Sequence, residues 1–122
     1  SVGLCLGRAL VEAVGDRAGL VRLGERTVPL GDARVRCVVD VSDRPAFVLE
    51  GALPTGHVGS FDVELCAPFL RALATEGRLA LHVIVERGGP RHHVAEACFL
   101  ALARALEQAT VVDTRRAPTL KN

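Results

Sequence analysis

RLALHVIVERGGPRHHVAEACFLALARALEQA, residues 78–109, contains the two clearest secondary-structure signals of the chain. Apolar residues alternate along 78–86, which predicts a strand with one buried face. Gly88, Gly89 and Pro90 end that strand. The Ala- and Leu-rich residues 92–109 then predict the longest helix of the protein. The chain therefore combines strands and helices.

The segments on either side give further elements. Apolar spacing predicts helices over 2–14 and 61–75, and Pro68 should kink the second helix or end its first part. Strands are predicted at 34–41 and 46–53, joined as a hairpin by the turn 42–45. Two short strand-like pieces, 20–23 and 26–29, are joined by Gly24.

Length and composition narrow the class of protein. The chain has 122 residues, enough for one compact domain, and its net charge of +1 gives no sign of a nucleic-acid binder. No apolar run is long enough to predict a membrane span, and no secretory signal is visible. Four cysteines lie in apolar runs and are expected to be buried free thiols of a cytoplasmic protein: Cys5, Cys37, Cys66 and Cys98. A helix that starts at Ser1, without a Met, suggests that N-terminal sequence is missing.

His92-His93-Val94-Ala95-Glu96 is the strongest chemical signal. His92 and Glu96 are four apart on the predicted helix, so both can reach one ion. His93 lies about 100° further around the helix and points elsewhere. The pattern therefore suggests two metals, or metals shared between subunits, with Mn, Fe, Zn or Ni as candidates. The alternative is a pair of surface histidines at a helix start.

An internal similarity links the two ends of the chain. Residues 4–10, LCLGRAL, match residues 100–106, LALARAL, within predicted helices. Such a repeat indicates a duplicated half-domain, although two Ala/Leu-rich helices can also look alike by chance.

The chain closely resembles the imidazoleglycerol-phosphate dehydratase family. Residues 92–106 resemble its second metal motif, HHxxEAxFKALARAL. Other matches are 61–73 with FDTEL…FFRAL, 40–45 with DLSGRP, 15–24 with GDRxGIxRxG, and 2–10 with VGIALGQAL. The resemblance implies an α+β fold of duplicated half-domains (ribosomal protein S5 domain 2-like), with four-stranded sheets and helices packed on one face. Residues 1–30 would be the remnant of an incomplete N-terminal half-domain, and 31–122 the second half-domain with the metal helix and a C-terminal phosphate loop.

The resemblance also implies a function. The family dehydrates imidazoleglycerol phosphate to imidazoleacetol phosphate in histidine biosynthesis, with two Mn²⁺ per active site, in a cytoplasmic homo-oligomer that is a 24-mer in the family. No nucleic-acid or membrane partner is expected. Carried over by motif, the metal ligands are His92, His93 and Glu96, with Glu96 also catalytic; the phosphate-binding residues are Arg22, Arg44, Thr119 and Lys121; and Asp32 is near the substrate.

Several positions depart from the family pattern. The first motif, HHxxED, is absent, because Ser1 follows directly after the place of its glutamate. Pro68 stands where many members carry a metal-ligating histidine, and Pro90 replaces an asparagine. Leu120 and Asn122 break the PSTKG loop. Two hypotheses follow: an enzyme that is active only at full length, or a degenerate, non-catalytic homologue that still assembles and keeps a residual metal site. A plain metal-binding module is a third.

Two further histidines lie outside the motif. His82, on the polar side of the strand 78–86, is expected to be structural and hydrogen-bonded near the metal helix. His57 is expected to be solvated in a loop. The 122-residue chain alone is expected to show little or no dehydratase activity.

Overall fold

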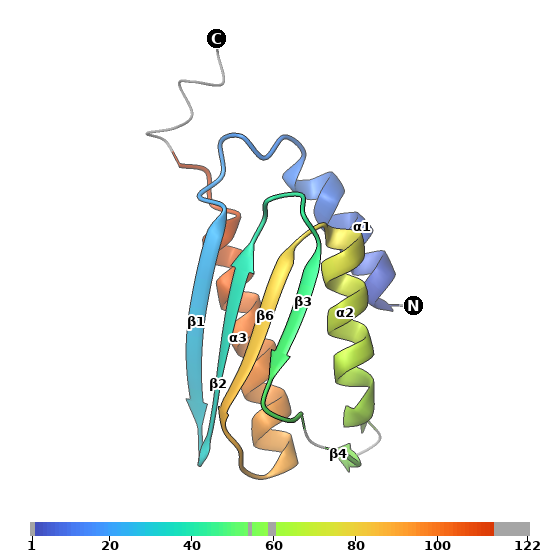
Figure 1. The fold of residues 1–122 in the computed structure, drawn as a ribbon, viewed down its shortest axis with the longest axis vertical. Coiled ribbons are helices and arrows are strands. Elements are labelled where there is room, and N and C mark those ends of the chain that lie inside the picture. The colour runs from blue at the N-terminus through green and yellow to red at the C-terminus, as the bar shows by residue number, and fades with distance from the viewer. Residues whose placement is uncertain (1, 54, 59–60, 114–122) are drawn as a thin grey trace.

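A computed structural model describes residues 2–53, 55–58 and 61–113. The elements in chain order are α1 (Val2–Val14), β1 (Leu23–Leu30), β2 (Ala33–Asp40), β3 (Ala46–Glu50), β4 (His57–Val58), β5 (Phe61–Asp62), a 3₁₀ turn (Val63–Leu65), α2 (Cys66–Gly77), β6 (Ala80–Arg87) and α3 (Arg91–Ala109). Helices and strands pack together, so the predicted α+β class is confirmed (Figure 1).

The main sheet has the strand order β1-β2-β6-β3. β1 pairs with β2 and β2 with β6 in antiparallel fashion, whereas β3 runs parallel to β6. The predicted hairpin between 34–41 and 46–53 is therefore wrong, because β6 lies between those strands. α2 forms the crossover between the parallel strands β3 and β6, as parallel pairing requires.

The helices α2 and α3 cover one face of this sheet, as predicted (Figure 1). The core joins alternate residues of β2 and β6 to the inner face of α3, and its fully buried members include Val35, Cys37, Val39, Leu81, Val83, Ala97, Cys98 and Ala101. Gly24 of β1 lies directly against the carbonyl of Ala105, where a Cβ would find no room. α3 is thus fixed along the length of β1 and β2.

α1 packs on α2 rather than on the sheet. Gly3 and Gly7 make this contact close: a Cβ on Gly3 would lie 2.7 Å from the Phe69 carbonyl oxygen, and one on Gly7 would lie 2.6 Å from the Glu76 Cβ. The far side of α1 is exposed, with Val2 at 69%. Cys5 is also exposed, so the expectation of four buried thiols is wrong for this one.

Two local predictions need correction. The two pieces at 20–23 and 26–29 are not separate, because β1 runs unbroken from Leu23 to Leu30 in register with β2. The predicted helix 61–75 begins as an α-helix only at Cys66. Pro68 therefore falls in the first turn, where an N–H has no intrahelical acceptor and proline is tolerated.

Candidate functional site

The HHxxE residues lie at the open amino end of α3, whose first residue, Arg91, follows Pro90. Proline has no side-chain group that could cap the helix, and its carbonyl accepts the His93 N–H at 2.9 Å. The His92 and Glu96 side chains are exposed, and His93 is half-buried. The two imidazole centroids are 4.2 Å apart. The end of β6 and the start of α3 lie close together in the chain. Both imidazole rings are therefore at one edge of the molecule.

His93 is held by the turn between β1 and β2. Gly31 and Asp32 form this two-residue turn, and Gly31 has φ +57°, a left-handed conformation that favours glycine. A Cβ on Gly31 would lie 2.7 Å from Nδ1 of His93, so the ring fills the space that a side chain would need. Asp32 therefore belongs to the turn that contacts the candidate metal residues. Gly31 was missed from the sequence, although Gly-Asp between two alternating runs is a recognisable hairpin signal.

The donors at this end suit a transition metal, because imidazole nitrogens and carboxylate oxygens are its usual ligands. Nδ1 of His93 is buried and has no hydrogen-bond partner within the described part of the chain. Among those same residues, however, no group of three or more His, Cys, Asp or Glu side chains converges on one point. The residue types fit a metal, but an ion here needs donors beyond this set.

The predicted phosphate arginines precede β1 and lie between β2 and β3, at the end of the sheet opposite the start of α3 (Figure 1). Arg22 precedes β1 with φ +82°, and its guanidinium donates to both carboxylate oxygens of Asp40, at 2.7 and 3.2 Å. This hydrogen bond and the Asp40 charge raise the pKa of Arg22. Arg44 is exposed in the turn between β2 and β3. Its neighbour Asp43 has φ +68°, which aspartate tolerates better than most residues.

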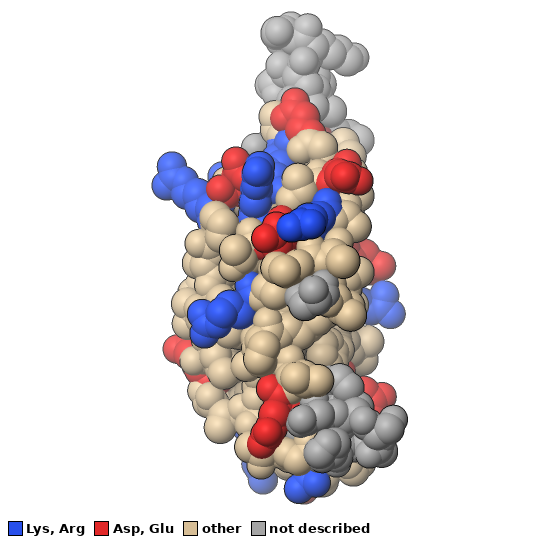
Figure 2. All heavy atoms as spheres, turned by 90° about the vertical axis from the view of Figure 1, so that its right-hand side faces the viewer, with Lys and Arg blue, Asp and Glu red and all other residues tan. Residues whose placement is uncertain are grey.

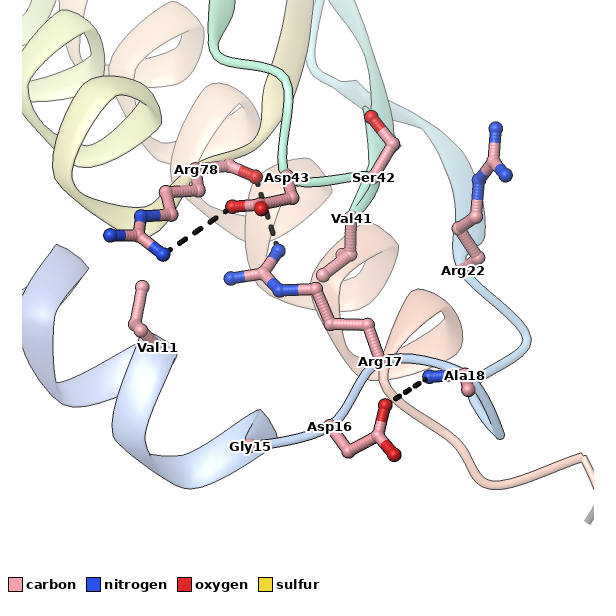
Figure 3. Close-up of a pocket in the computed structure, with 10 residues that line it drawn as sticks. All are labelled: Val11, Gly15, Asp16, Arg17, Ala18, Arg22, Val41, Ser42, Asp43 and Arg78. Atoms are coloured by element: carbon pink, nitrogen blue, oxygen red, sulfur yellow. Dashed lines mark hydrogen bonds and ion pairs between the residues drawn. The ribbon is translucent and has the colours of Figure 1, made fainter. Parts of the chain in front are cut away.

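A cavity of about 460 Å³ adjoins Arg22 at this end (Figure 3). Two arginines that the sequence did not single out, Arg17 and Arg78, line it with Asp16 and Asp43. Figure 2 shows charged side chains of both signs gathered in the upper part of the face formed by α1 and α2, above a largely uncharged middle. No local pattern reveals the contacts of these arginines, because their partners are distant in sequence.

Four further residues were considered from the sequence. Thr119 and Lys121 lie outside the described residues. His82 is exposed on the sheet face opposite α3, so its expected position near the metal helix is wrong. His57 belongs to the short strand β4, and its side chain is not among those described.

The two candidate sites are separated by the length of α3. The Arg22 N–H bonds to the carbonyl of Ala109 at 2.8 Å, so Arg22 lies at the carboxyl end of the helix. From His93 to Ala109 the axis extends about 24 Å, at the usual rise per residue. Within one copy, residues at the two ends are too far apart to contact one small ligand.

A model of the imidazoleglycerol-phosphate dehydratase family matches residues 1–106. The chain belongs to this family. It is 51% identical over 114 residues to the imidazoleglycerol-phosphate dehydratase of Geobacillus thermodenitrificans, covering 93% of this chain and 58% of that protein. It is 47% identical to the one from Bacillus subtilis, covering 93% and 59%.

Two solved structures of the family resemble the fold. The crystal structure of the Staphylococcus aureus dehydratase superimposes with a TM-score of 0.87 at 38% identity, over 92% of this chain and 65% of that one. The Pyrococcus furiosus enzyme, solved in complex with (S)-C348, gives 0.82 at 32% identity, over 94% and 64%.

The chain thus spans about 58% of the length of the first curated relatives that it matches. Within this family segment, none of the described helices combines the length and apolar character needed to cross a membrane.

Proposed function

We propose that this chain is part of a metal-dependent imidazoleglycerol-phosphate dehydratase, a hydro-lyase that forms imidazoleacetol phosphate in histidine biosynthesis. Family membership supports this proposal, as do the two histidines at the exposed amino end of α3. Identity near 50% to curated dehydratases argues against the degenerate alternative. The four cysteines are unpaired, which suits the reducing cytoplasm, where we propose that the protein acts.

We assign the metal to His92, His93 and Glu96, with Mn²⁺ as the expected ion and two ions per active site. When bound, the metal would orient the imidazole and stabilise negative charge as a Lewis acid. His92 and Glu96 share one helical face and would hold the same ion. The Glu96 carboxylate, exposed to solvent, could also accept the proton from the reacting carbon. Gly31 closes the neighbouring side by packing against His93, in the turn that also contains Asp32.

At the other end, Arg22 and Arg44 would bind the substrate phosphate. A planar guanidinium can donate two parallel hydrogen bonds to phosphate oxygens. The hydrogen bonds to Asp40 keep the guanidinium of Arg22 oriented. Thr119 and Lys121 are proposed to complete this site. Because the two ends are about 24 Å apart along α3, we infer that each active site combines the metal end of one copy with the phosphate end of another. The protein would then be a homo-oligomer, for which the family precedent is a 24-mer.

The observation that carries the proposal is the pair of adjacent histidines at the open start of α3 in a chain of this family. Calorimetric titration with imidazoleglycerol phosphate, with and without Mn²⁺, tests it. We expect binding that requires Mn²⁺ and disappears in the variant His92→Ala/His93→Ala. Binding that is unaffected by both changes would contradict the proposal.

A further inference from the structure

The carboxyl end of α2 has an unusual residue at a demanding position. Arg78 follows the helix with φ 55° and ψ 50°, where glycine is the usual choice. Its N–H bonds to the Thr75 carbonyl, and the Leu79 N–H bonds to that of Ala74, which together satisfy two of the last carbonyls. The carbonyls of Gly77 and of Arg78 itself need other donors.

Arg17 supplies both donors from a segment 60 residues away. Its Nη2 donates to the Gly77 carbonyl at 3.2 Å and its Nη1 to the Arg78 carbonyl at 3.1 Å. A cation at a helix carboxyl end is also favoured by the helix dipole. Figure 3 shows the Arg17 side chain reaching across the cavity from the loop after α1 to the Arg78 backbone. This contact ties the loop between α1 and β1 to the connection between α2 and β6.

Each of the two segments that Arg17 connects leads to a candidate phosphate-binding residue. Arg22 ends the loop that contains Arg17, and its carbonyl accepts the Val41 N–H at 2.9 Å. On the other side, the Arg78 guanidinium lies 3.5 Å from the carboxylate of Asp43, the residue before Arg44. That ion pair is exposed and weak by itself, so the two Arg17 hydrogen bonds are the stronger part of the brace.

The cavity is not a good anion site in its own right. Two of the Arg17 donors are already bonded to carbonyls, and Asp16 and Asp43 add negative charge to the cavity wall. The Arg22 side chain points away from the other side chains that line the cavity (Figure 3), and its guanidinium donates to Asp40. Arg17 therefore acts on its neighbours rather than on a ligand in this cavity.

We propose that Arg17 is a positioning residue that sets the relative placement of Arg22 and Arg44. This inference rests on the proposed phosphate role of those two residues. Removing Arg17 would leave the Gly77 and Arg78 carbonyls without their charged donor and loosen the loop before Arg22, whose own N–H stays bonded to Ala109. The site at the start of α3 is at the other end of the sheet and would not change.

The test compares Arg17→Ala and Arg17→Lys with the parent chain, with Arg104→Ala as a control. Arg104 forms an exposed ion pair with Glu107 on α3, so its loss should have no effect. In titrations with inorganic phosphate followed by NMR, we expect Arg17→Ala to weaken binding about tenfold or more, as expected for lost charge-assisted hydrogen bonds. Arg17→Lys, which retains the charge, should recover part of that loss. Mn²⁺ uptake should be the same in all four proteins.

A second readout does not depend on phosphate. Hydrogen exchange of the Arg22 and Val41 amides, and the NMR signal of the Arg22 Nε–H bonded to Asp40, report the loop directly. We expect faster exchange and a broadened signal in Arg17→Ala, with partial recovery in Arg17→Lys. If the parent does not bind phosphate, the phosphate assignment fails while these signals still decide the role of Arg17. Unchanged signals in Arg17→Ala, or protection lost evenly across the whole chain, would overturn the inference.

Discussion

The two ends of α3 differ in how their polar side chains are satisfied. At the amino end, His92 and Glu96 are exposed, and Nδ1 of His93 has no hydrogen-bond partner among the described residues. Beyond the carboxyl end, Arg17 and Arg22 each make two hydrogen bonds to this chain's own oxygens. The side chains at the amino end are therefore available to bind ligands, whereas the arginines beyond the carboxyl end already bond to oxygens of this chain. This difference suggests that the metal end changes most when ions and other chains bind.

The largest expected effect is a loss of metal binding at the amino end of α3 that leaves phosphate binding at the other end unchanged. In His92→Ala/His93→Ala, stoichiometric Mn²⁺ uptake should be abolished, because both imidazole donors are removed. Binding of inorganic phosphate should be unchanged, because the change leaves Arg22 and its bonds to Asp40 intact. Metal analysis after gel filtration, together with phosphate titration, measures both. Metal content equal to that of the parent would refute the assignment of the metal end.

Metal removal should also change the assembly. If ions are shared between copies, a chelator withdraws the ligand that favours the assembled state and shifts a large species to smaller ones. Light scattering before and after chelation measures this shift. A monomer under both conditions would contradict shared metal sites.

A smaller change tests how His93 is oriented. Gly31→Ala adds a Cβ 2.7 Å from Nδ1 of His93 at a position with φ +57°. We expect the ring to move and Mn²⁺ affinity to fall severalfold, with a loss of about 1 kcal/mol in unfolding free energy from the left-handed backbone. Phosphate affinity should not change. Equal Mn²⁺ affinity in the variant would show that the turn does not position His93.

The smallest expected effect concerns the middle of α3, which connects the two ends. A hydrogen bond with Cys37, together with burial, raises the pKa of the Cys98 thiol, so this group stays protonated at neutral and mildly alkaline pH. Thiol labelling of the native chain near pH 8 should therefore modify exposed Cys5 and spare Cys98. Rapid labelling of Cys98 without unfolding would show that this part of the helix opens.

Local patterns predicted most elements, and non-local pairing accounts for the errors. The helices over 2–14 and 92–109 were predicted to within one residue, because their apolar spacing is visible along the chain. The hairpin prediction failed because β6 enters between β2 and β3, and sequence proximity cannot indicate such an insertion. The predicted start of the helix that contains Pro68 was wrong, because the α-helix begins at Cys66, after its apolar pattern has started.

The candidate site shows the same division. His92, His93 and Glu96 could be grouped from sequence because one helical turn holds them together. Their distance from Arg22 is visible only in the structure, where Arg22 contacts the carboxyl end of α3. The contacts of Arg17 join residues 60 and 61 positions apart, and the contact of Gly31 with His93 depends on how the hairpin meets the helix. Neither leaves a local signal.

A mixing experiment tests most directly whether each active site is shared between copies. Two variants are prepared, His92→Ala/His93→Ala and Arg22→Gln/Arg44→Gln; each lacks one end and should not bind imidazoleglycerol phosphate in the presence of Mn²⁺. They are then combined in equal amounts, dissociated with chelator and reassembled with Mn²⁺. We predict that the mixture regains binding at about a quarter of the parent's sites, since random pairing between copies joins two intact ends that often. No recovery in a mixture of well-folded variants that have exchanged subunits would contradict a site built from two chains.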